Sequence, residues 1–151
     1  MTSQAALVCD PGDHTEAPDD HNAIDFGSKP VVVYDGDCGF CKLWIIEWKK
    51  HLAEKLHYAP SQLVAPRFPS IKPEEFKNAV QLAFPDNTHY GGAHAVYKIL
   101  SFSDKKWHRG LLPLYEHFFP FKLLSKIGYH FIALHRPLFF SVSKHILKIK
   151  H

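Results

Sequence analysis

The pattern of hydrophobic and polar residues changes abruptly between residues 34 and 40. Residues 31–34, Val-Val-Val-Tyr, form an apolar run of β-branched and aromatic side chains with polar residues on both sides, which predicts a buried strand. From Phe40 onward the apolar residues recur at every third or fourth position, which predicts an amphipathic helix that ends near Lys55. The segment between them, Asp-Gly-Asp-Cys-Gly, is rich in turn-forming residues and joins the strand to the helix.

The next segments predict short elements in a definite order. Residues 56–60 form a second strand that Pro60 stops, and residues 72–76 begin a helix with Pro73 in its first turn. Residues 78–84 and 88–91 read as two strands of a hairpin around a Pro-Asp-Asn turn, and residues 91–102 as a helix. Strands and helices that alternate in this way predict an α/β domain with helices flanking a sheet.

The chain after Trp107 is predicted to be an α-helical extension rich in aromatic residues. Three prolines, Pro113, Pro120 and Pro137, are expected to cut it into short segments. We expect its aromatic side chains to cover the open face of the sheet. The alternative is a non-enzymatic module that holds a partner or makes peripheral membrane contact through the basic aromatic helices.

Composition places the chain in a broad class. With 151 residues and 46% apolar residues, it is long enough for one globular domain. Its first residues do not resemble a secretory signal, it has no apolar run of membrane-spanning length, and it has only three cysteines, which together predict a cytoplasmic protein. The net charge of +3 is too small to indicate nucleic-acid binding.

Charge is distributed unevenly along the chain. Residues 1–29 contain six acidic residues and one basic residue and show no periodicity, which predicts a disordered acidic N-terminal tail that includes Cys9. Residues 30–151 are then the folded domain, with the helical extension starting at about residue 107. No acidic residue follows Glu116, so the end of the chain is basic.

The two remaining cysteines, Cys38 and Cys41, lie where the first strand turns into the first helix. A helix N-terminus carries unpaired N–H groups and partial positive charge, which lower the pKa of a thiol placed there. Cys41 follows one helical turn later, within reach of a disulfide with Cys38. This spacing predicts thiol–disulfide exchange, with Cys38 as the attacking thiol and Cys41 as the resolving thiol.

Four neighbouring residues complete the predicted site. Asp37 is expected to cap the helix, and Asp35 either anchors the turn or relays a proton to Cys41. Both carboxylates would oppose formation of a thiolate. Phe40 offers an apolar contact to a substrate, and Gly92 is a second candidate substrate-binding residue.

The sequence Tyr-Asp-Gly-Asp-Cys-Gly-Phe-Cys, residues 34–41, resembles the signature of the DCC thiol-disulfide oxidoreductase family. The resemblance extends to residues 56–62, which look like the second strand of the family with its Pro and Gln, to residues 90–100, and to residues 128–140. It implies a thioredoxin-like mixed sheet flanked by helices and places Asp37, Cys38 and Cys41 at the redox site. No organic cofactor is expected, because electrons would come from a dithiol protein or a small thiol, and the substrate would be a disulfide-containing protein or small molecule.

Two other chemistries use the same residues. Cys38 and Cys41 could supply half of a zinc site, with His89 and His94 as candidate partners, although no second ligand pair is evident. Residues 31–39 also resemble the start of haloacid-dehalogenase-type phosphatases, in which an Asp nucleophile follows a buried strand. Gly39 departs from that pattern, and no acidic pair for Mg²⁺ is evident downstream.

Overall fold

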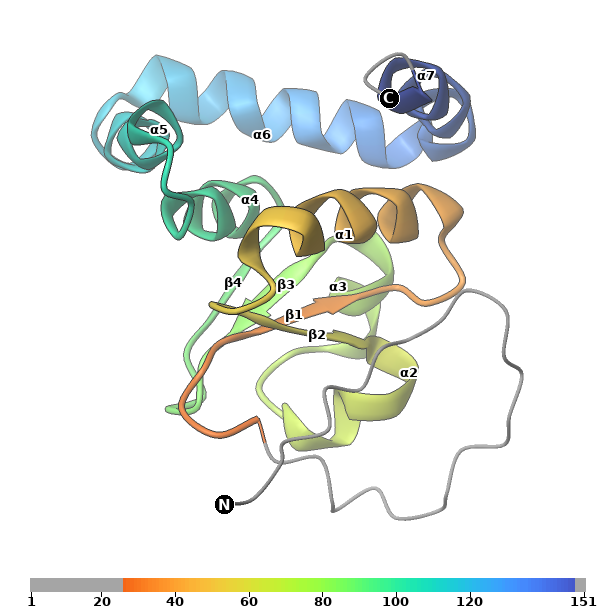
Figure 1. The fold of residues 1–151 in the computed structure, drawn as a ribbon, viewed down its shortest axis with the longest axis vertical. Helices are drawn as coiled ribbons and strands as arrows, with labels where there is room; N and C mark the ends of the chain where they lie inside the picture. Colours follow the sequence, from red (N-terminus) through yellow and green to blue (C-terminus); the bar gives the residue numbers. More distant parts are fainter. Residues whose placement is uncertain (1–25, 149–151) are drawn as a thin grey trace.

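Four short strands form one mixed sheet in the computed structural model, which describes residues 26–148 (Figure 1). The strands are β1 (Val31–Tyr34), β2 (His57–Pro60), β3 (Gln81–Ala83) and β4 (His89–Gly91). Their order across the sheet is β2-β1-β3-β4, with β1 parallel to β2 and antiparallel to β3, and with β3 and β4 forming the predicted hairpin.

Helices lie on both faces of this sheet. They are α1 (Gly39–Leu52), α2 (Ser61–Val64), the 3₁₀ helix η1 (Ala65–Arg67), α3 (Pro73–Asn78) and α4 (Gly92–Ser101). In Figure 1, α1 and α4 lie above the sheet and α2 lies below it. The order of elements and the mixed sheet flanked by helices confirm the predicted α/β fold class.

The alternation of side chains along β1 divides the hydrophobic core into two parts. Val31 and Val33 point to one face, where they pack against residues of α2 and α3 that include Val64 and Phe76. Val32 and Tyr34 point to the other face and join the cluster that α1 and α4 build. All four residues of β1 are buried, as the continuous apolar run predicted.

The C-terminal extension consists of three helices, α5 (Lys106–His117), α6 (Phe119–Leu134) and α7 (Arg136–Lys148). Pro120 and Pro137 lie in the first turns of α6 and α7, where a missing N–H costs no helical hydrogen bond. The prediction that Pro113 ends a segment is wrong, because Pro113 lies inside α5. Packing of α5 against α4 stabilises this helix in spite of the hydrogen bond that Pro113 cannot donate.

We had expected the extension to cover the open face of the sheet, and this prediction is wrong. That face is already occupied by α1 and α4, so α5 and α6 pack on α4, and α7 packs on α1 (Figure 1). The three helices therefore form a second helical layer. One side of this layer faces α1 and α4, and the other side faces away from the sheet.

The described residues begin at Phe26, before the predicted boundary at residue 30. Phe26 packs against the core cluster around Val31, and its ring lies 5.3 Å from the Arg67 guanidinium. The remainder of the predicted acidic tail, residues 1–25 with Cys9, lies outside the described residues.

Candidate functional site

Cys38 occupies the N-cap position of α1. Its backbone is extended, with φ −85° and ψ 106°, and its Sγ accepts a hydrogen bond from the backbone N–H of Cys41 at 3.2 Å. The prediction that Asp37 caps this helix is wrong. Because α1 begins at Gly39, the side chain that can reach the N–H groups of the first turn is the Cys38 thiol.

The two sulfur atoms are 2.7 Å apart, with the Cys41 thiol donating a hydrogen bond to Cys38 Sγ. Both cysteines are free thiols and half-buried, so Cys38 is neither bonded nor sealed in the interior. The pair therefore has the proximity that formation of an intramolecular disulfide requires.

The environment of the pair moves the two pKa values in opposite directions. The hydrogen bond from the Cys41 thiol is the main reason that the pKa of Cys38 falls from 9.0 to about 6, and the backbone N–H of Cys41 and the Arg136 charge act in the same direction. Burial and the Asp35 charge oppose this shift. The hydrogen bond to Cys38, burial and the Cys38 charge raise the pKa of Cys41 above its ordinary value. Cys38 is thus the thiolate at neutral pH, and Cys41 retains its proton.

Asp35 and Asp37 are joined by one side chain, Gln62, from the short helix α2. Gln62 Nε2 donates hydrogen bonds to Asp35 Oδ1 at 3.0 Å and to Asp37 Oδ2 at 3.2 Å. Gln62 Oε1 accepts from the backbone N–H of Gly36 at 3.0 Å, and Asp35 Oδ1 also accepts from the N–H of Asp37. These contacts make Asp35 an anchor of the turn that carries the cysteines.

Gln62 was absent from the predicted site. Its position, two residues after the end of β2, places it beside the turn because β1 and β2 are parallel and end at the same edge of the sheet. The sequence held one signal for it, the Pro and Gln that follow the second strand in the family resemblance.

The C-terminal extension contributes Arg136 to the site, a residue that we had not predicted. Its guanidinium donates to the carbonyl oxygens of Lys77 at 2.8 Å and Asn78 at 2.6 Å, at the end of α3. Its charge favours the thiolate form of both cysteines, although the pKa of Cys41 remains raised by its other surroundings. Phe140, on α7, packs its ring over Gly39, where an added Cβ would lie 3.5 Å from the ring.

Tyr129, on α6, is the second unpredicted residue of the extension. Its hydroxyl accepts a hydrogen bond from the backbone N–H of Val80 at 3.1 Å. Burial is the main cause that raises the pKa of Tyr129, and the charges of Cys41 and Cys38 contribute in the same direction. Tyr129 is therefore electrostatically coupled to the cysteine pair although it follows Cys38 by 91 positions in the sequence.

The two predicted substrate-binding residues lie in different places. Phe40 is half-buried in the first turn of α1, next to Cys41, and packs edge-to-face against Trp44 with ring centroids 6.3 Å apart. Gly92 has a positive φ of 61°, a conformation that favours glycine, and lies against the Tyr129 ring. No described contact joins Gly92 to either cysteine.

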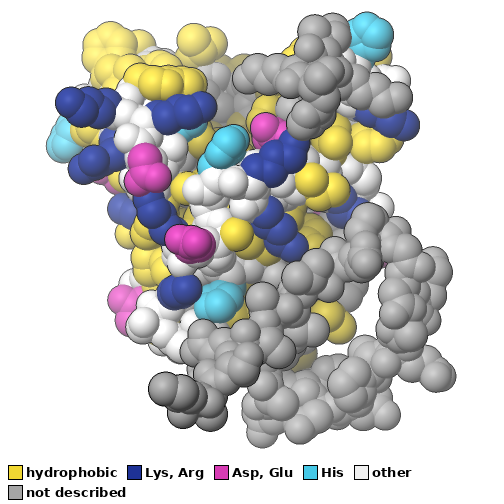
Figure 2. All heavy atoms as spheres, viewed as in Figure 1, with side chains coloured by type: hydrophobic (Ala, Val, Ile, Leu, Met, Phe, Trp, Pro, Cys, Tyr) yellow, Lys and Arg dark blue, Asp and Glu magenta, His cyan; other side chains and the backbone are white. Residues whose placement is uncertain are grey.

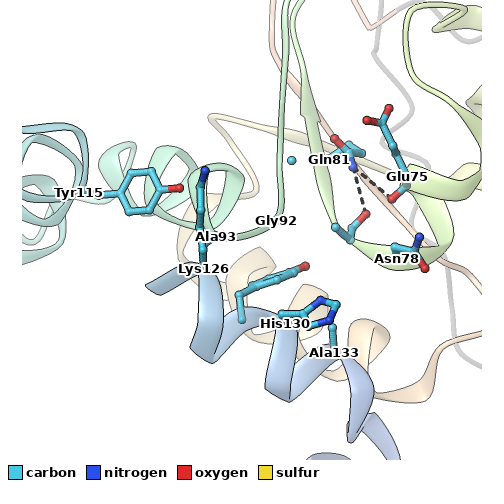
Figure 3. Close-up of a pocket in the computed structure, with 12 residues that line it drawn as sticks. Glu75, Asn78, Gln81, Gly92, Ala93, Tyr115, Lys126, His130 and Ala133 are labelled. Carbon is cyan, nitrogen blue, oxygen red and sulfur yellow. Dashed lines mark hydrogen bonds between the residues drawn. The ribbon is translucent and has the colours of Figure 1, made fainter. Parts of the chain in front are cut away.

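Gly92 instead lines a cavity of about 400 Å³ between the end of β4 and α6 (Figure 3). Polar side chains around this cavity include Glu75, Asn78, Lys126 and His130, while neither cysteine lines it. In Figure 3, Gln81 donates hydrogen bonds to the backbone rather than pointing freely into the space. The cavity is separate from the sulfur atoms of the site.

The described residues offer no cluster for a metal ion. Within residues 26–148, no three His, Cys, Asp or Glu side chains come together as a set of potential ligands. His94, one of the candidate zinc ligands, contacts Glu116 Oε1 at 3.2 Å and the Tyr90 ring. The zinc alternative therefore gains no support from the geometry.

Comparison with known proteins gives one match. A family model described as DCC1-like thiol-disulfide oxidoreductase matches residues 32–142, which include the cysteine pair, Gln62, Tyr129 and Arg136. No curated protein and no solved structure matches the chain.

Proposed function

We propose that this chain, which belongs to the DCC1-like thiol-disulfide oxidoreductase family, exchanges disulfides through the Cys38 and Cys41 pair. The observation that carries the proposal is the hydrogen bond between the two sulfur atoms, 2.7 Å apart, together with the opposite pKa shifts it produces. A thiolate beside a protonated thiol supplies both participants that a dithiol exchange reaction needs.

In the first step, the Cys38 thiolate attacks one sulfur of a substrate disulfide. A bond forms between Cys38 Sγ and that sulfur, the substrate S–S bond breaks, and the second substrate sulfur leaves as a thiolate that takes a proton from water. Phe40, adjacent in sequence to the pair, offers an apolar surface for the substrate.

In the second step, Cys41 resolves the mixed disulfide. Once Cys38 is bonded to the substrate, it no longer carries the charge that raises the pKa of Cys41, so Cys41 loses its proton to water more readily. The Cys41 thiolate attacks Cys38 Sγ, the Cys38–Cys41 disulfide forms, and the remaining substrate sulfur is released. The substrate gains two electrons, and the protein loses them.

A dithiol protein or a small thiol then reduces the Cys38–Cys41 disulfide, with no organic cofactor. The proposed substrates are disulfide-containing proteins or small disulfides, and the proposed compartment is the cytoplasm, in which such reductants are abundant. The low cysteine content supports this placement.

The test is oxidation of the full chain by glutathione disulfide, followed by mass spectrometry. We expect the wild type to lose two hydrogens, Cys38→Ser to form no intramolecular disulfide and to exchange much more slowly, and Cys41→Ser to accumulate a mixed disulfide at Cys38. The matched control is Cys9→Ser, which removes the third cysteine and should exchange at the wild-type rate. Full exchange activity in both Cys38→Ser and Cys41→Ser would refute the proposal.

A further inference from the structure

Each of α6 and α7 carries a row of exposed apolar side chains on its outward side, and we call the two rows together the outer apolar stripe. Its members recur at helical spacing along one side of the two helices: Phe119, Leu123, Leu124, Ile127, Phe131 and Leu134 on α6, and Leu138, Val142 and Ile146 on α7. Phe119 is 72% exposed and Leu124 is 68% exposed. Exposed apolar surface of this extent marks an interaction site in a soluble fold.

The fold does not need this stripe for its own packing, because α6 meets the domain through its other side. On that inner side, the Tyr97 ring of α4 lies 5.6 Å from the Phe121 ring, and the Tyr97 hydroxyl is 2.9 Å from Ser125 Oγ. Tyr129 also points inward, to Val80. Among the described residues, the helix therefore has one side that packs on the domain and a second, apolar side that is exposed.

Positive charge is concentrated on the three helices of the extension, and negative charge is scarce there. Lys126 and Lys144 are exposed on α6 and α7, and Lys106 and Arg109 are exposed on α5. Within α5, α6 and α7 the single acidic residue is Glu116, which contacts His94 and Lys98 of α4. Figure 2 shows hydrophobic side chains gathered at the upper left edge, with Lys and Arg side chains just below them.

An apolar stripe on helices that carry an excess of positive charge matches the chemistry of a membrane surface that contains anionic lipids. A second copy of the chain fits less well, because two such surfaces in contact would bring lysines together without acidic partners from these helices. None of the described helices has the length and apolar character needed to cross a bilayer. At 16 residues, α6 is about 24 Å long, so its stripe suits a helix that lies along the surface.

We propose that the outer apolar stripe binds the surface of membranes that contain anionic lipids, with α6 lying parallel to the bilayer. The apolar side chains enter the interface between headgroups and acyl chains, and the net positive charge of α5, α6 and α7 attracts the anionic lipid headgroups. This attachment is independent of the proposed redox function, since no contact within the described part of the chain joins a stripe residue to either cysteine.

The test is co-sedimentation of the full-length protein with phosphatidylcholine vesicles, with and without phosphatidylserine. We expect binding to the vesicles with phosphatidylserine, weaker binding at high salt, and little binding to phosphatidylcholine alone. The double variant Leu124→Glu/Ile127→Glu should bind at least about tenfold more weakly, because it removes two large apolar side chains and adds two negative charges.

The control is Ile46→Glu, which repeats one of the two substitutions, Ile→Glu, on α1 at a residue that is 50% exposed. It should bind vesicles like the wild type, and all variants should retain the wild-type rate of thiol alkylation as a check of folding. Light scattering after gel filtration tests the alternative, in which a second copy of the chain covers the stripe. Equal binding by the wild type and the double variant, absence of binding by the wild type, or a dimer that the double variant disperses would each overturn the proposal.

Discussion

At the scale of single residues, the reactivity of the site depends on which of two sulfur atoms holds the proton. The cap position of Cys38 supplies one backbone N–H, but the Cys41 thiol supplies the larger effect on the pKa of Cys38. A helix N-terminus alone is therefore an incomplete account of this site. The second cysteine both resolves the mixed disulfide and activates the first.

This dual role predicts a difference between two substitutions of Cys41. The alkylation rate of Cys38 should rise with pH around a midpoint near 6 in the wild type, because the thiolate is the reactive form. Cys41→Ala removes the donor and should raise the midpoint by about one to two pH units, since a hydrogen bond to a charged group contributes about 1.5–3 kcal/mol. Cys41→Ser retains a hydroxyl donor and should show a smaller increase. Identical midpoints in the two variants would contradict the assigned hydrogen bond.

Arg136 allows a second prediction at this scale. Arg136→Met keeps much of the apolar stem but removes the charge that favours the Cys38 thiolate, so alkylation at pH 6 should slow by roughly two- to fivefold. Arg136→Lys keeps the charge and should restore most of the rate, although it cannot donate to Lys77 and Asn78 in the same way. A rate in Arg136→Met equal to that of the wild type would show that the charge does not reach the sulfur.

At the scale of elements, Gln62 holds the active-site turn together with the hydrogen bonds that Asp35 accepts within the turn. The side chain of Gln62 contacts Gly36, Asp35 and Asp37 at once, and so connects the end of β1 to the segment after β2. The amide is suited to this position, since it can donate to two carboxylates and accept from a backbone N–H at the same time.

Two substitutions of Gln62 should therefore differ. Gln62→Ala should lower the free energy of unfolding by about 1 kcal/mol, because the lost hydrogen bonds are exposed to water. Gln62→Glu should cost more at neutral pH, since it places a third carboxylate beside Asp35 and Asp37, and the additional loss should shrink on acidification. Urea denaturation at two pH values measures both effects. If the free energy of unfolding of Gln62→Glu falls by the same amount at both pH values, the assigned contacts of Gln62 with Asp35 and Asp37 are contradicted.

The contact between α6 and the start of β3 gives a further prediction at this scale. Tyr129→Phe leaves the N–H of Val80 without its acceptor and should lower the free energy of unfolding by about 1–2 kcal/mol. Hydrogen exchange at the amide of Val80 should accelerate in the same variant. Tyr97→Phe is the matched control, because it also removes a hydroxyl from the interface of α4 and α6 but leaves the Val80 amide bonded. Unchanged exchange at Val80 would contradict the assigned contact.

The elements were more predictable from the sequence than their packing. The run at Val31 and the period from Phe40 specify β1 and α1, because local sterics and burial determine both patterns. Pro113 was misread, since the packing of α5 on α4 outweighs one lost hydrogen bond. We assigned the N-cap to Asp37 because Asp is a more common N-cap residue than Cys. Since α1 begins at Gly39, the N-cap position is that of Cys38 instead.

At the scale of the whole molecule, the site is assembled from segments that are far apart in the sequence. The cysteine positions follow from the motif, but Arg136 and Tyr129 reach the site only through the way that α6 and α7 pack on the domain. No periodicity in the sequence specifies those long-range contacts. The prediction that the extension covers the sheet was wrong for the same reason, since it did not account for α1 and α4 having filled that face.

The coupling of the two cysteines predicts a pH-dependent reduction potential for the whole protein. Below about pH 6, reduction of the disulfide should take up two protons per two electrons, because both sulfur atoms end as thiols. Above that pH it should take up one, since the folded protein holds Cys38 as a thiolate and Cys41 as a thiol. The slope of potential against pH, measured by equilibration with dithiothreitol, should therefore halve near pH 6. A single slope up to pH 8 would show that the pKa of Cys38 is not lowered.

The passage of α7 over the start of α1 has a consequence for protein engineering. Phe140 rests on Gly39, and Arg136 lies within electrostatic reach of both sulfur atoms, so the last third of the chain is an integral part of the chemistry. A graft of residues 34–41 onto another scaffold would transfer the two thiols without the Phe140 ring or the Arg136 charge. The unit that can be transplanted intact is the entire domain.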